Sequence, residues 1–558
     1  MTRTMRAVVL SGLVMAGAVA IATTLGAAEP DASGWDAKAA AKYLDSRAEW
    51  WSTWPNAARD KGTFCISCHT TLPYAIARPA LRTTLGESGP SPSESKILNN
   101  LLTRARDWRD IEPFYPDQTR GIPKTSESRA IESVMNAVVL ARRDAGAGRL
   151  SDDTRTALGV MWSLQMKTGP NNGAWTWLNF NYDPWESPNS PYFGASLAAL
   201  AVGSAPEGYA ATPEIQNNLK ALRGYFDRQH GTVSVLNQLM GLWASARVPG
   251  LLTDQQRRAT IDATLALQQA DGGWNAASLG TFKRVDNTAN DTRSDGYATA
   301  LAALAMQEAG VPRTDPRIAK GLDWLRRNQD RATGRWVATS LNKERDPESD
   351  AGKFMSDAAT AYAVLALTYQ PPPVTIAQKL DTPQVRVYTA TLQPRAPVVS
   401  KNGHATHRAL IYMDDGVMTI KDGADTATIK FKRGDVRWRP AGGPYTAENM
   451  SDHPIRILEI DLKAAPAGPL PVTKLDPVAV DPKHYKVEFE NEFVRVLRVH
   501  FGPGEKGATH EHILNRVVFY VNDQPNAKVD DVRMSGAATH AEANESAQPA
   551  DRIAVEIK

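Results

Sequence analysis

The segment Cys65-Ile66-Ser67-Cys68-His69 holds both cysteines of the chain in a CxxCH arrangement. Two thiols three positions apart can add to the two vinyl groups of a haem, and the adjacent histidine can then bind the iron from the same side. We therefore predict a covalent c-type haem (haem c) that is attached to Cys65 and Cys68, with His69 as an axial ligand of the iron.

Two other uses of this cysteine pair are open. A CxxC pair can be redox-active, but such motifs lie near a βαβ pattern, and none surrounds this segment. The pair could also supply two of four zinc ligands, but no other cysteine exists and no histidine lies between His69 and His230. No Met-Pro loop marks a sixth haem ligand, so Met135, Met161 and Met166 are the candidates, and an open position is the alternative.

The N-terminus has the pattern of a secretory signal. Arg3 and Arg6 precede an apolar run, residues 7–22, and small residues follow as far as Ala28. A basic region, an apolar region and small residues suited to cleavage predict a signal peptide over residues 1–28, with an uncleaved signal anchor as the alternative. Export agrees with the haem prediction, because bacterial c-type haem is attached outside the cytoplasm. We therefore expect a periplasmic or secreted protein.

Composition and net charge limit the classes of partner and of fold that we expect. The 558 residues include 64 Lys and Arg against 61 Asp and Glu, so the net charge of +3 suggests no nucleic acid partner. Hydrophobic residues make up 42% of the chain, which is enough for packed cores in several domains. Because both cysteines belong to one motif, the chain has no disulfide framework.

Residues 36–370 have a helical pattern with recurring segments. The Ala-rich segments 192–202, 296–310 and 356–368 are hydrophobic nearly all round, which is typical of helices packed inside other helices. Between them a second signature recurs: an amphipathic helix, then Gln, then Gly-x-Trp. Repeats of this length predict stacked units that bury their faces against each other. The three copies are Gln165 with 173–175, Gln268 and Gln269 with 272–274, and Gln329 with 334–336.

These segments resemble the QW repeats of squalene–hopene cyclases and related prenyltransferase and squalene-oxidase-repeat proteins. The resemblance implies an α/α toroid, in which outer helices surround inner helices around a central cavity. Residues 43–51, Phe64 and 72–77 fit the same template, with Phe64 at the tryptophan position, so CxxCH falls in the loop before an inner helix. We therefore expect the haem at the mouth of the toroid cavity. An independent cytochrome c domain over residues 37–150 is the alternative.

The cyclase resemblance also implies a protonating cluster of aspartates, which this chain does not reproduce. Asp286 and Asp295 are the candidate catalytic residues, but each keeps one acid where the family has three. Asp295 precedes a predicted inner helix, where a lone Asp is typical of an N-cap. Prenyltransferase chemistry is disfavoured, because its zinc needs a cysteine that this chain cannot spare.

A proline run ends the helical region. Gln370 is followed by three prolines, which lack the amide donor and fix φ. The pattern then alternates with period two, which predicts the strands of β-sandwich or barrel units. Two copies of one unit follow each other. The matching segments are 385–390 and 494–499, 408–415 and 516–523, and 457–463 and 553–558.

The histidines of the second copy resemble the two cupin motifs. His510 and His512 follow Gly504 with the spacing of the first motif, and His540 with Asn544 matches the second. The resemblance implies that His510, His512 and His540 bind a divalent metal inside a β-barrel. Three imidazoles suit zinc, iron or nickel.

The match to the cupin motifs has gaps. Arg516 or Val517 stands where the family has a metal-binding glutamate, so a metal-free structural cupin is the alternative for the second copy. The second copy is also shorter between the motifs, which predicts an incomplete barrel. The first copy has Asn402, His404 and Tyr445 at the matching positions, so we expect no metal there.

The predicted fold class is multidomain: an α/α toroid of the terpenoid cyclase-like type followed by two β-barrel, cupin-like domains. The predicted parts are 1–28 signal peptide, 29–100 haem-binding part of the helical region, 101–370 toroid with QW-like repeats, 371–384 Pro-rich linker, 385–463 degenerate cupin-like domain, 464–483 linker and 484–558 cupin-like domain.

The function expected from these features is that of an exported c-type haem protein with an electron-transfer or oxidoreductase role. A redox partner protein and an apolar small-molecule ligand are the expected partners. The sequence leaves open whether the chain is an enzyme, with a haem-dependent oxidoreductase as the candidate. The alternatives are a non-enzymatic ligand-binding or sensing module and, less favoured, a terpenoid cyclase-like enzyme.

Overall fold

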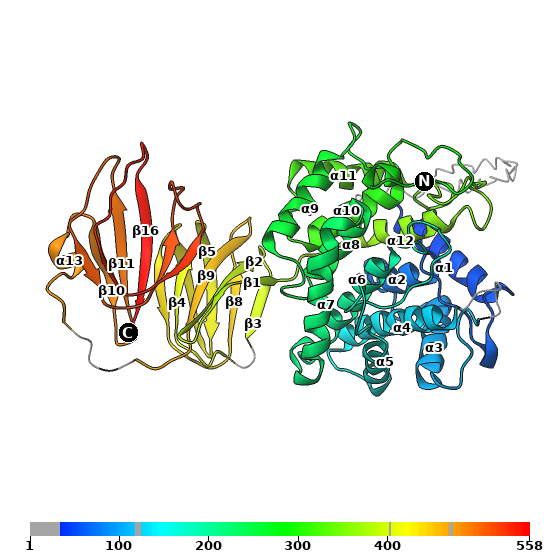
Figure 1. The fold of residues 1–558 in the computed structure, drawn as a ribbon, viewed down its shortest axis with the longest axis horizontal. Coiled ribbons are helices and arrows are strands. Elements are labelled where there is room, and N and C mark those ends of the chain that lie inside the picture. The colour runs from blue at the N-terminus through cyan, green and yellow to red at the C-terminus, as the bar shows by residue number, and fades with distance from the viewer. Residues whose placement is uncertain (1–33, 118–123, 401–402, 467, 469–471) are drawn as a thin grey trace, which may run out of the picture. The chain divides into compact units, whose positions relative to one another are not determined.

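The computed structural model of the chain forms two compact units, Met1–Tyr369 and Gln370–Lys558. The first unit is helical and the second is rich in strands (Figure 1). The predicted signal peptide, 1–28, and Asn402 lie outside the described residues. No helix within the described part of the chain is long and apolar enough to cross a bilayer. The structure describes residues 34–117, 124–400, 403–466, 468 and 472–558.

The helical unit alternates amphipathic helices with buried ones. The buried helices contact each other in chain order, and the last of them, α12, contacts the first, α2. Each amphipathic helix packs on the outside of one or two buried helices. The buried helices are α2 (Thr71–Leu85), α4 (Thr125–Ala147), α6 (Ser190–Ser204), α8 (Val235–Ser245), α10 (Gly296–Glu308) and α12 (Phe354–Thr368). The amphipathic helices are α1 (Ala37–Thr53), α3 (Pro92–Arg106), α5 (Asp152–Ser163), α7 (Gln216–Gln229), α9 (Asp254–Ala266) and α11 (Pro316–Arg327).

The chemistry of the helices explains this alternation. In α6, α10 and α12, alanine and other small residues cover every side, so these helices can be enclosed by their neighbours. In α11 the buried residues are confined to one stripe, and charged residues face solvent. The segments predicted to be inner helices are thus helical and buried.

The Gln…Gly-x-Trp repeats share one hydrogen-bonding pattern. The tryptophan is fully buried, and its indole N–H donates to a carbonyl in the last turn of the preceding outer helix. The glutamine amide donates to the first glycine's carbonyl. The indole bonds are Trp175 to Met161, Trp274 to Thr264 and Trp336 to Leu325, each at 2.7 Å. The glutamine bonds are Gln165 to Gly173 and Gln268 to Gly272 at 2.8 Å, and Gln329 to Gly334 at 2.9 Å.

In the repeat unit that contains CxxCH, the corresponding hydrogen bond runs in the opposite direction, from the outer helix to the loop. Phe64 occupies the tryptophan position and is buried, but its ring has no donor. Instead Trp51 of α1 donates its indole N–H to the carbonyl of Cys65 at 2.6 Å. The outer helix and the Gly-x-aromatic loop are therefore still joined, which fits the predicted place of CxxCH in the repeat template.

The β-rich unit contains one sheet twice, in the strand orders β1-β2-β9-β4-β7 and β10-β11-β16-β13-β14. Each copy has a smaller second sheet, β3-β8-β5-β6 and β12-β15 respectively. The predicted duplication is therefore present in the topology. The first copy comprises β1 (Val374–Asp381), β2 (Val385–Leu392), β3 (Pro397–Ser400), β4 (Arg408–Tyr412), β5 (Gly416–Asp422), β6 (Asp425–Phe431), β7 (Val436–Arg439), β8 (Tyr445–Asn449) and β9 (Ile455–Leu462). The second comprises β10 (Tyr485–Glu490), β11 (Val494–Phe501), β12 (His510–His512), β13 (Arg516–Tyr520), β14 (Val532–Ser535), β15 (Ala538–His540) and β16 (Ala550–Ile557).

The shorter second copy lacks one hairpin. In the first copy, β5 and β6 pair with each other between β4 and β7, whereas no strand of the described chain lies between β13 and β14. The smaller sheet of the second copy is correspondingly reduced to β12 and β15. This matches the expectation of an incomplete barrel.

The two segments predicted as linkers both contain regular secondary structure. Within 371–384, β1 forms the edge of the first large sheet and pairs antiparallel with β2. Its side chains are mostly exposed, so it lacks the apolar alternation that marks a strand in sequence. Within 464–483, Pro477–Val480 forms a short helix, α13, that is capped by Asp476.

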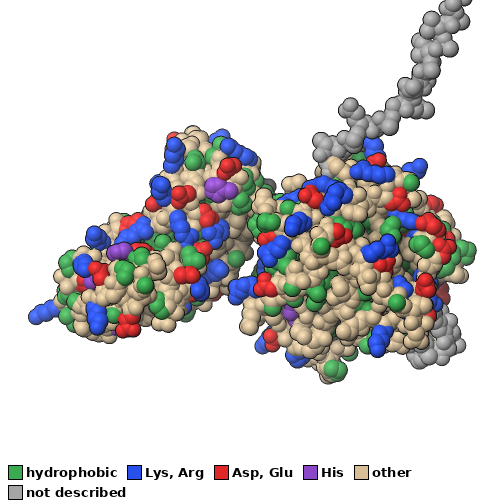
Figure 2. All heavy atoms as spheres, turned by 90° about the horizontal axis from the view of Figure 1, so that it is seen from above, with side chains coloured by type: hydrophobic (Ala, Val, Ile, Leu, Met, Phe, Trp, Pro, Cys, Tyr) green, Lys and Arg blue, Asp and Glu red, His purple; other side chains and the backbone are tan. Residues whose placement is uncertain are grey.

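On the face drawn in Figure 2, basic and acidic side chains are interspersed.

Candidate functional site

The CxxCH segment lies in the loop between α1 and α2, directly before a buried helix. Ser67 fixes this loop, because its hydroxyl accepts from the amides of Thr70 and Thr71 at 3.2 and 3.1 Å. Its own amide donates to Thr71 Oγ1 at 2.8 Å. The central residue of the motif thus ties the loop to the start of α2, with the cysteines and His69 on either side of it.

The hydrogen bonds of His69 define its tautomer. Its Nδ1 lies 2.8 Å from Thr70 Oγ1, and Thr70 Oγ1 in turn donates to Asp357 Oδ2 at 2.7 Å. The single hydroxyl proton is used on Asp357, so the Thr70 oxygen accepts from Nδ1–H. The Nε2 lone pair of His69 is left available. Burial lowers the pKa of His69 to about 3, so the imidazole is neutral.

Asp357 anchors this chain of hydrogen bonds at the start of α12. Besides Thr70, its carboxylate accepts from Tyr43 at 2.7 Å and from Arg47 Nε at 2.9 Å, both on α1. Burial raises the pKa of Asp357, but Arg47 opposes this, and three donors on one carboxylate are the pattern of an ionised acid. The network joins α1, α2 and α12, and sequence reasoning missed it because its members are far apart in the chain.

Three aromatic rings surround His69. Phe354 stacks on the imidazole with 3.7 Å between ring centroids, and Trp51 meets it edge-on at 5.0 Å. Trp185, from the loop after the Gly-x-Trp of the second repeat, lies at 5.7 Å. The structure thus brings a loop that lies more than a hundred residues away in the chain next to His69.

Both thiols are buried and protonated. Cys65 and Cys68 are 6% and 7% exposed. Burial raises the pKa of Cys65 to about 12 and that of Cys68 well above its usual value, and the charge of Glu186 adds to both shifts. Both cysteines belong to the hydrophobic core of the helical unit.

The predicted sixth ligands are not among the contacts described for His69. Met135 in α4 and Met161 in α5 are fully buried core residues. The carbonyl of Met161 accepts the Trp175 indole bond of the repeat. Met166 follows α5 and is partly buried.

The candidate catalytic aspartates have structural partners. Asp295 is the N-cap of α10: its Oδ1 accepts from the amides of Tyr297 and Ala298, and its Oδ2 from Ala276 at 2.6 Å. Burial raises its pKa to about 6. Asp286 is exposed in a loop and accepts from Thr288. The capping alternative therefore describes Asp295, and the two acids do not hydrogen-bond to each other.

The second candidate site lies in the β-rich unit, on β12 and β15. His510 pairs with His540 across these strands, and His512 is two residues further along β12. Their ligand atoms lie within 4.8 Å of one another. Within the described part of the chain, this is the only group of three His, Cys, Asp or Glu side chains placed to hold a metal ion. The structure thus brings the three predicted ligands together.

The Nδ1 atoms of His510 and His512 are hydrogen-bonded in the way that is common for metal-binding histidines. His510 Nδ1 lies 2.9 Å from the carbonyl of Ala508, and His512 Nδ1 lies 2.8 Å from Glu556 Oε1. The Nε2 atoms of His510 and His540 are buried without a hydrogen-bond partner among the described residues. Metal ligands commonly use Nδ1 for such an outer bond and present Nε2 to the ion.

A carboxylate lies beside the histidines, although not at the expected sequence position. Arg516, which replaces the family's glutamate, donates to the carbonyl of Gly536 at 2.7 Å. Glu542 Oε1 lies 3.5 Å from His540 Nε2 and also pairs with Arg552 at 2.9 Å. Sequence reasoning missed Glu542, although its position two residues after His540 was a usable signal.

The first copy offers no comparable group in its described residues. His404 Nε2 accepts a hydrogen bond from Arg439 Nε at 2.8 Å, so the nitrogen that would bind a metal is occupied. Tyr445 packs edge-on against the same ring. In this geometry, therefore, His404 has no free Nε2 to offer a metal ion.

Comparison with known proteins gives limited information. No family model and no curated protein matches the chain. A cupin domain from Bordetella pertussis Tohama I is 22% identical, covers 17% of this chain and 99% of its own, and has a TM-score of 0.16. A cupin 2 conserved barrel domain protein from Leptotrichia buccalis is 14% identical, covers 34% and 91%, and has a TM-score of 0.25. A single-substitution variant of Bacillus subtilis oxalate decarboxylase is 11% identical, covers 33% and 75%, and has a TM-score of 0.25.

These neighbours are of the kind that the cupin-like prediction named for the two β domains. Similarities of this size concern the fold of a minor part of the chain and say nothing about its activity. The function has to be argued from the two sites themselves.

Proposed function

We propose that this chain is an exported c-type haem protein with an electron-transfer or oxidoreductase role. Cys65 and Cys68 would hold the haem covalently, and His69 Nε2 would bind its iron. The observation that supports this best is the tautomer of His69: Thr70 and Asp357 fix the proton on Nδ1 and leave Nε2 free. When bound, the haem supplies one-electron redox chemistry.

The arrangement of the helices supports the α/α toroid as the scaffold. Six buried helices contact each other in a cycle, with α12 returning to α2. The CxxCH loop, the Trp185 loop and Phe354 lie at N-terminal ends of α2, α6 and α12. The haem would therefore sit where the starts of the buried helices meet, at the mouth of the toroid, and not in a separate cytochrome domain.

The two other uses of the cysteine pair fit less well. A redox-active CxxC pair needs a thiol with a lowered pKa and access to its substrate, whereas both thiols here are buried with raised pKa values. A zinc site needs further ligands, and the cysteines belong to no such group among the described residues.

Under this proposal, burial of the thiols would determine when the haem can be attached. Neither described cavity is lined by Cys65, Cys68 or His69, and Phe354 stacks directly on the imidazole. Haem attachment therefore has to precede the packing of Trp51, Trp185 and Phe354 around the loop. We expect folded, haem-free protein to resist loading unless it is first unfolded.

The test is an absorption spectrum of the full chain produced with the c-type haem maturation machinery, after acid extraction of unattached haem. Covalent haem in the parent, and none in Cys65→Ala/Cys68→Ala, supports the proposal. A parent without covalent haem overturns it. Carbon monoxide then separates the two roles: a shifted reduced spectrum indicates an accessible iron and catalysis, and an unmoved one indicates an electron carrier. The variant Cys65→Ser controls for loss of a single thioether.

A second candidate function is divalent metal binding by the second β copy. The Nε2 atom of His510 favours it, because a buried imidazole nitrogen without a hydrogen-bond partner among the described residues is costly unless it binds something. Metal content of the purified chain tests it. One divalent ion per chain, lost in His510→Gln, supports the site, and equal metal content in both proteins overturns it.

A further inference from the structure

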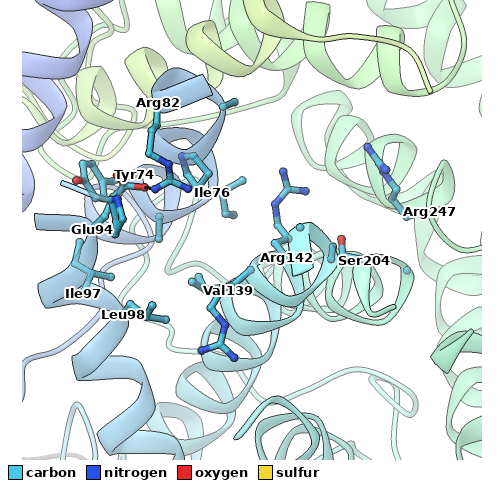
Figure 3. A pocket seen from close by; sticks show the side chains of 18 residues that line it. Tyr74, Ile76, Arg82, Glu94, Ile97, Leu98, Val139, Arg142, Ser204 and Arg247 are labelled. Carbon is cyan, nitrogen blue, oxygen red and sulfur yellow. Dashed lines mark hydrogen bonds and ion pairs between the residues drawn. The ribbon is translucent and has the colours of Figure 1, made fainter. Parts of the chain in front are cut away.

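A cavity of about 570 Å³ opens beside α2, α3 and α4, away from the CxxCH loop (Figure 3). It reaches the last turns of α4 and α6, whereas CxxCH precedes the first turn of α2. Its volume lies in the usual range for small-molecule sites, about 300–1,000 Å³. No motif in the sequence marks any residue of this cavity.

One wall of the cavity is apolar. It is formed by side chains of α2, α3 and α4 that face one another across the opening. Figure 3 shows Ile97 and Leu98 together on α3 and Val139 on α4. Such a wall fits a hydrocarbon group. The larger apolar lining residues are Ile76, Pro79, Ile97, Leu98 and Val139, and Ala75, Ala80, Pro90 and Ala145 also line the cavity.

Three of the four arginines at the cavity already have acidic partners. Arg82 pairs with Glu94 at 2.6 Å, Arg143 with Asp144 at 2.6 Å and Arg247 with Glu308 at 2.7 Å. These charges are compensated within the protein. These ion pairs make the rim of the cavity polar, but they leave no unpaired charge there for a ligand to neutralise.

Arg142 is different. No hydrogen bond or ion pair joins its guanidinium to any described residue, and the side chain is only partly buried among the residues that line the cavity. Burial and the nearby charge of Arg247 lower its pKa to about 10, against the opposing charge of Glu308, so it remains a cation at neutral pH. Arg142 is therefore the one arginine of this cavity whose donors are not used within the described part of the protein and are available to an anion.

We propose that this cavity binds an amphiphile with an oxyanion head, a carboxylate or a phosphate, and a medium-length apolar chain. Arg142 binds the head, because a guanidinium presents paired donors that match both groups. The apolar wall receives the chain. The site is independent of the haem, so failure of one proposal leaves the other standing.

Calorimetric titration of the full chain with dodecanoate, dodecyl phosphate and dodecanol tests the proposal. We expect saturable one-to-one binding of at least one anion, with a Kd at least tenfold higher in Arg142→Gln. Dodecanol should bind weakly and equally to both proteins. A preference for dodecanoate points to a fatty acid, and a preference for dodecyl phosphate to a phosphorylated lipid-like ligand.

Two further variants make the test decisive. Ala80→Phe, which fills the apolar part, should weaken dodecanoate and dodecanol alike, and Arg155→Gln, an exposed arginine paired with Glu207, should change neither. The unfolding temperature of Arg142→Gln shows whether the variant is folded when binding is measured. No anion binding, or equal anion binding by parent and Arg142→Gln, would overturn the proposal.

Discussion

Gln329 and Asp36 exchange two hydrogen bonds, although 293 positions separate them in the chain. The amide of Asp36 donates to Gln329 Oε1 at 2.6 Å, and Gln329 Nε2 donates to the carbonyl of Asp36 at 2.9 Å. In the other repeats the same glutamine nitrogen reaches a carbonyl at the start of the next outer helix. In the last repeat, the next outer helix is α1, so the repeat glutamine joins the two ends of the helical unit. The equivalent bonds are Gln165 to Asn218 at 3.0 Å and Gln268 to Arg317 at 2.8 Å.

Removal of this link should loosen α1. We expect Gln329→Ala to destabilise the helical unit by about 1–3 kcal/mol, because it removes the partner of the Asp36 amide and of the Gly334 carbonyl. Hydrogen exchange should rise first in α1, whose start loses its anchor. Gln268→Ala is the matched control, since it removes the same side chain from a repeat inside the ring. Equal exchange in α1 for both variants would contradict a role in closure.

If the proposed haem is bound, the Thr70 hydroxyl should lower its reduction potential. Thr70→Val removes the acceptor of His69 Nδ1–H and should raise the reduction potential, because the imidazole becomes a less basic ligand. It should also cost about 1–3 kcal/mol, since Asp357 loses a donor in a buried site. Redox titration measures the first effect and denaturant unfolding the second.

Thr71→Val is the control for this substitution. Thr71 accepts from the amide of Ser67 at 2.8 Å in the same loop but does not contact His69 in the described structure. It should lower stability without moving the potential. A potential that is unchanged in Thr70→Val, or moved equally by both variants, would show that the Thr70 bond does not act on the iron ligand.

Glu556 should support metal binding without touching the metal. Its carboxylate lies 2.8 Å from His512 Nδ1, and both side chains are buried. Replacement by Gln keeps the shape but weakens this bond, so the affinity for zinc should fall about tenfold, at the lower end of such effects. Competition with a chromogenic chelator gives the affinity. Glu490→Gln, which alters an exposed partner of Lys558, should leave it unchanged. Equal affinities for the two variants would exclude the orienting role.

Many individual helices and strands of this chain can be predicted from its sequence. Alanine and other small residues on all sides predict the enclosed helices α6, α10 and α12, and the observed helices match them. The strand patterns around 408–412 and 516–520 likewise predict the duplication seen in the sheets. These properties depend on neighbours within a few residues, which is why sequence periodicity reports them.

Contacts between residues that are far apart in the chain could not be predicted from the sequence. Asp357 reaches the CxxCH loop only because α12 packs beside α2, and no spacing in the sequence encodes that contact. Glu542 and Arg142 are ordinary charged residues until the fold places one beside His540 and leaves the other without a partner. Strand β1 was not predicted, because its pairing with β2 makes it a strand and its own sequence has no alternating apolar pattern.

His230 should make the stability of the helical unit depend on pH. It is buried, with Nδ1 2.6 Å from the Tyr192 hydroxyl and Nε2 2.7 Å from Thr260 Oγ1. Burial lowers its pKa to about 4, against about 6.5 in the unfolded chain. The folded state thus disfavours the proton, so stability is full above pH 6.5 and falls as the pH drops towards 4, by at most about 3 kcal/mol.

Denaturant unfolding of the full chain between pH 4 and 7, followed by tryptophan fluorescence, measures this effect. His230→Gln cannot titrate, so it should be less stable than the parent at pH 7, and the gap should narrow as the pH falls. His453→Gln is the control, because this histidine is exposed in the β-rich unit and its pKa is raised by Asp452. If the gap between the parent and His230→Gln stays constant across this range, the protonation of His230 is not coupled to folding. The buried Tyr192–His230–Thr260 contact would then tolerate a charged imidazole.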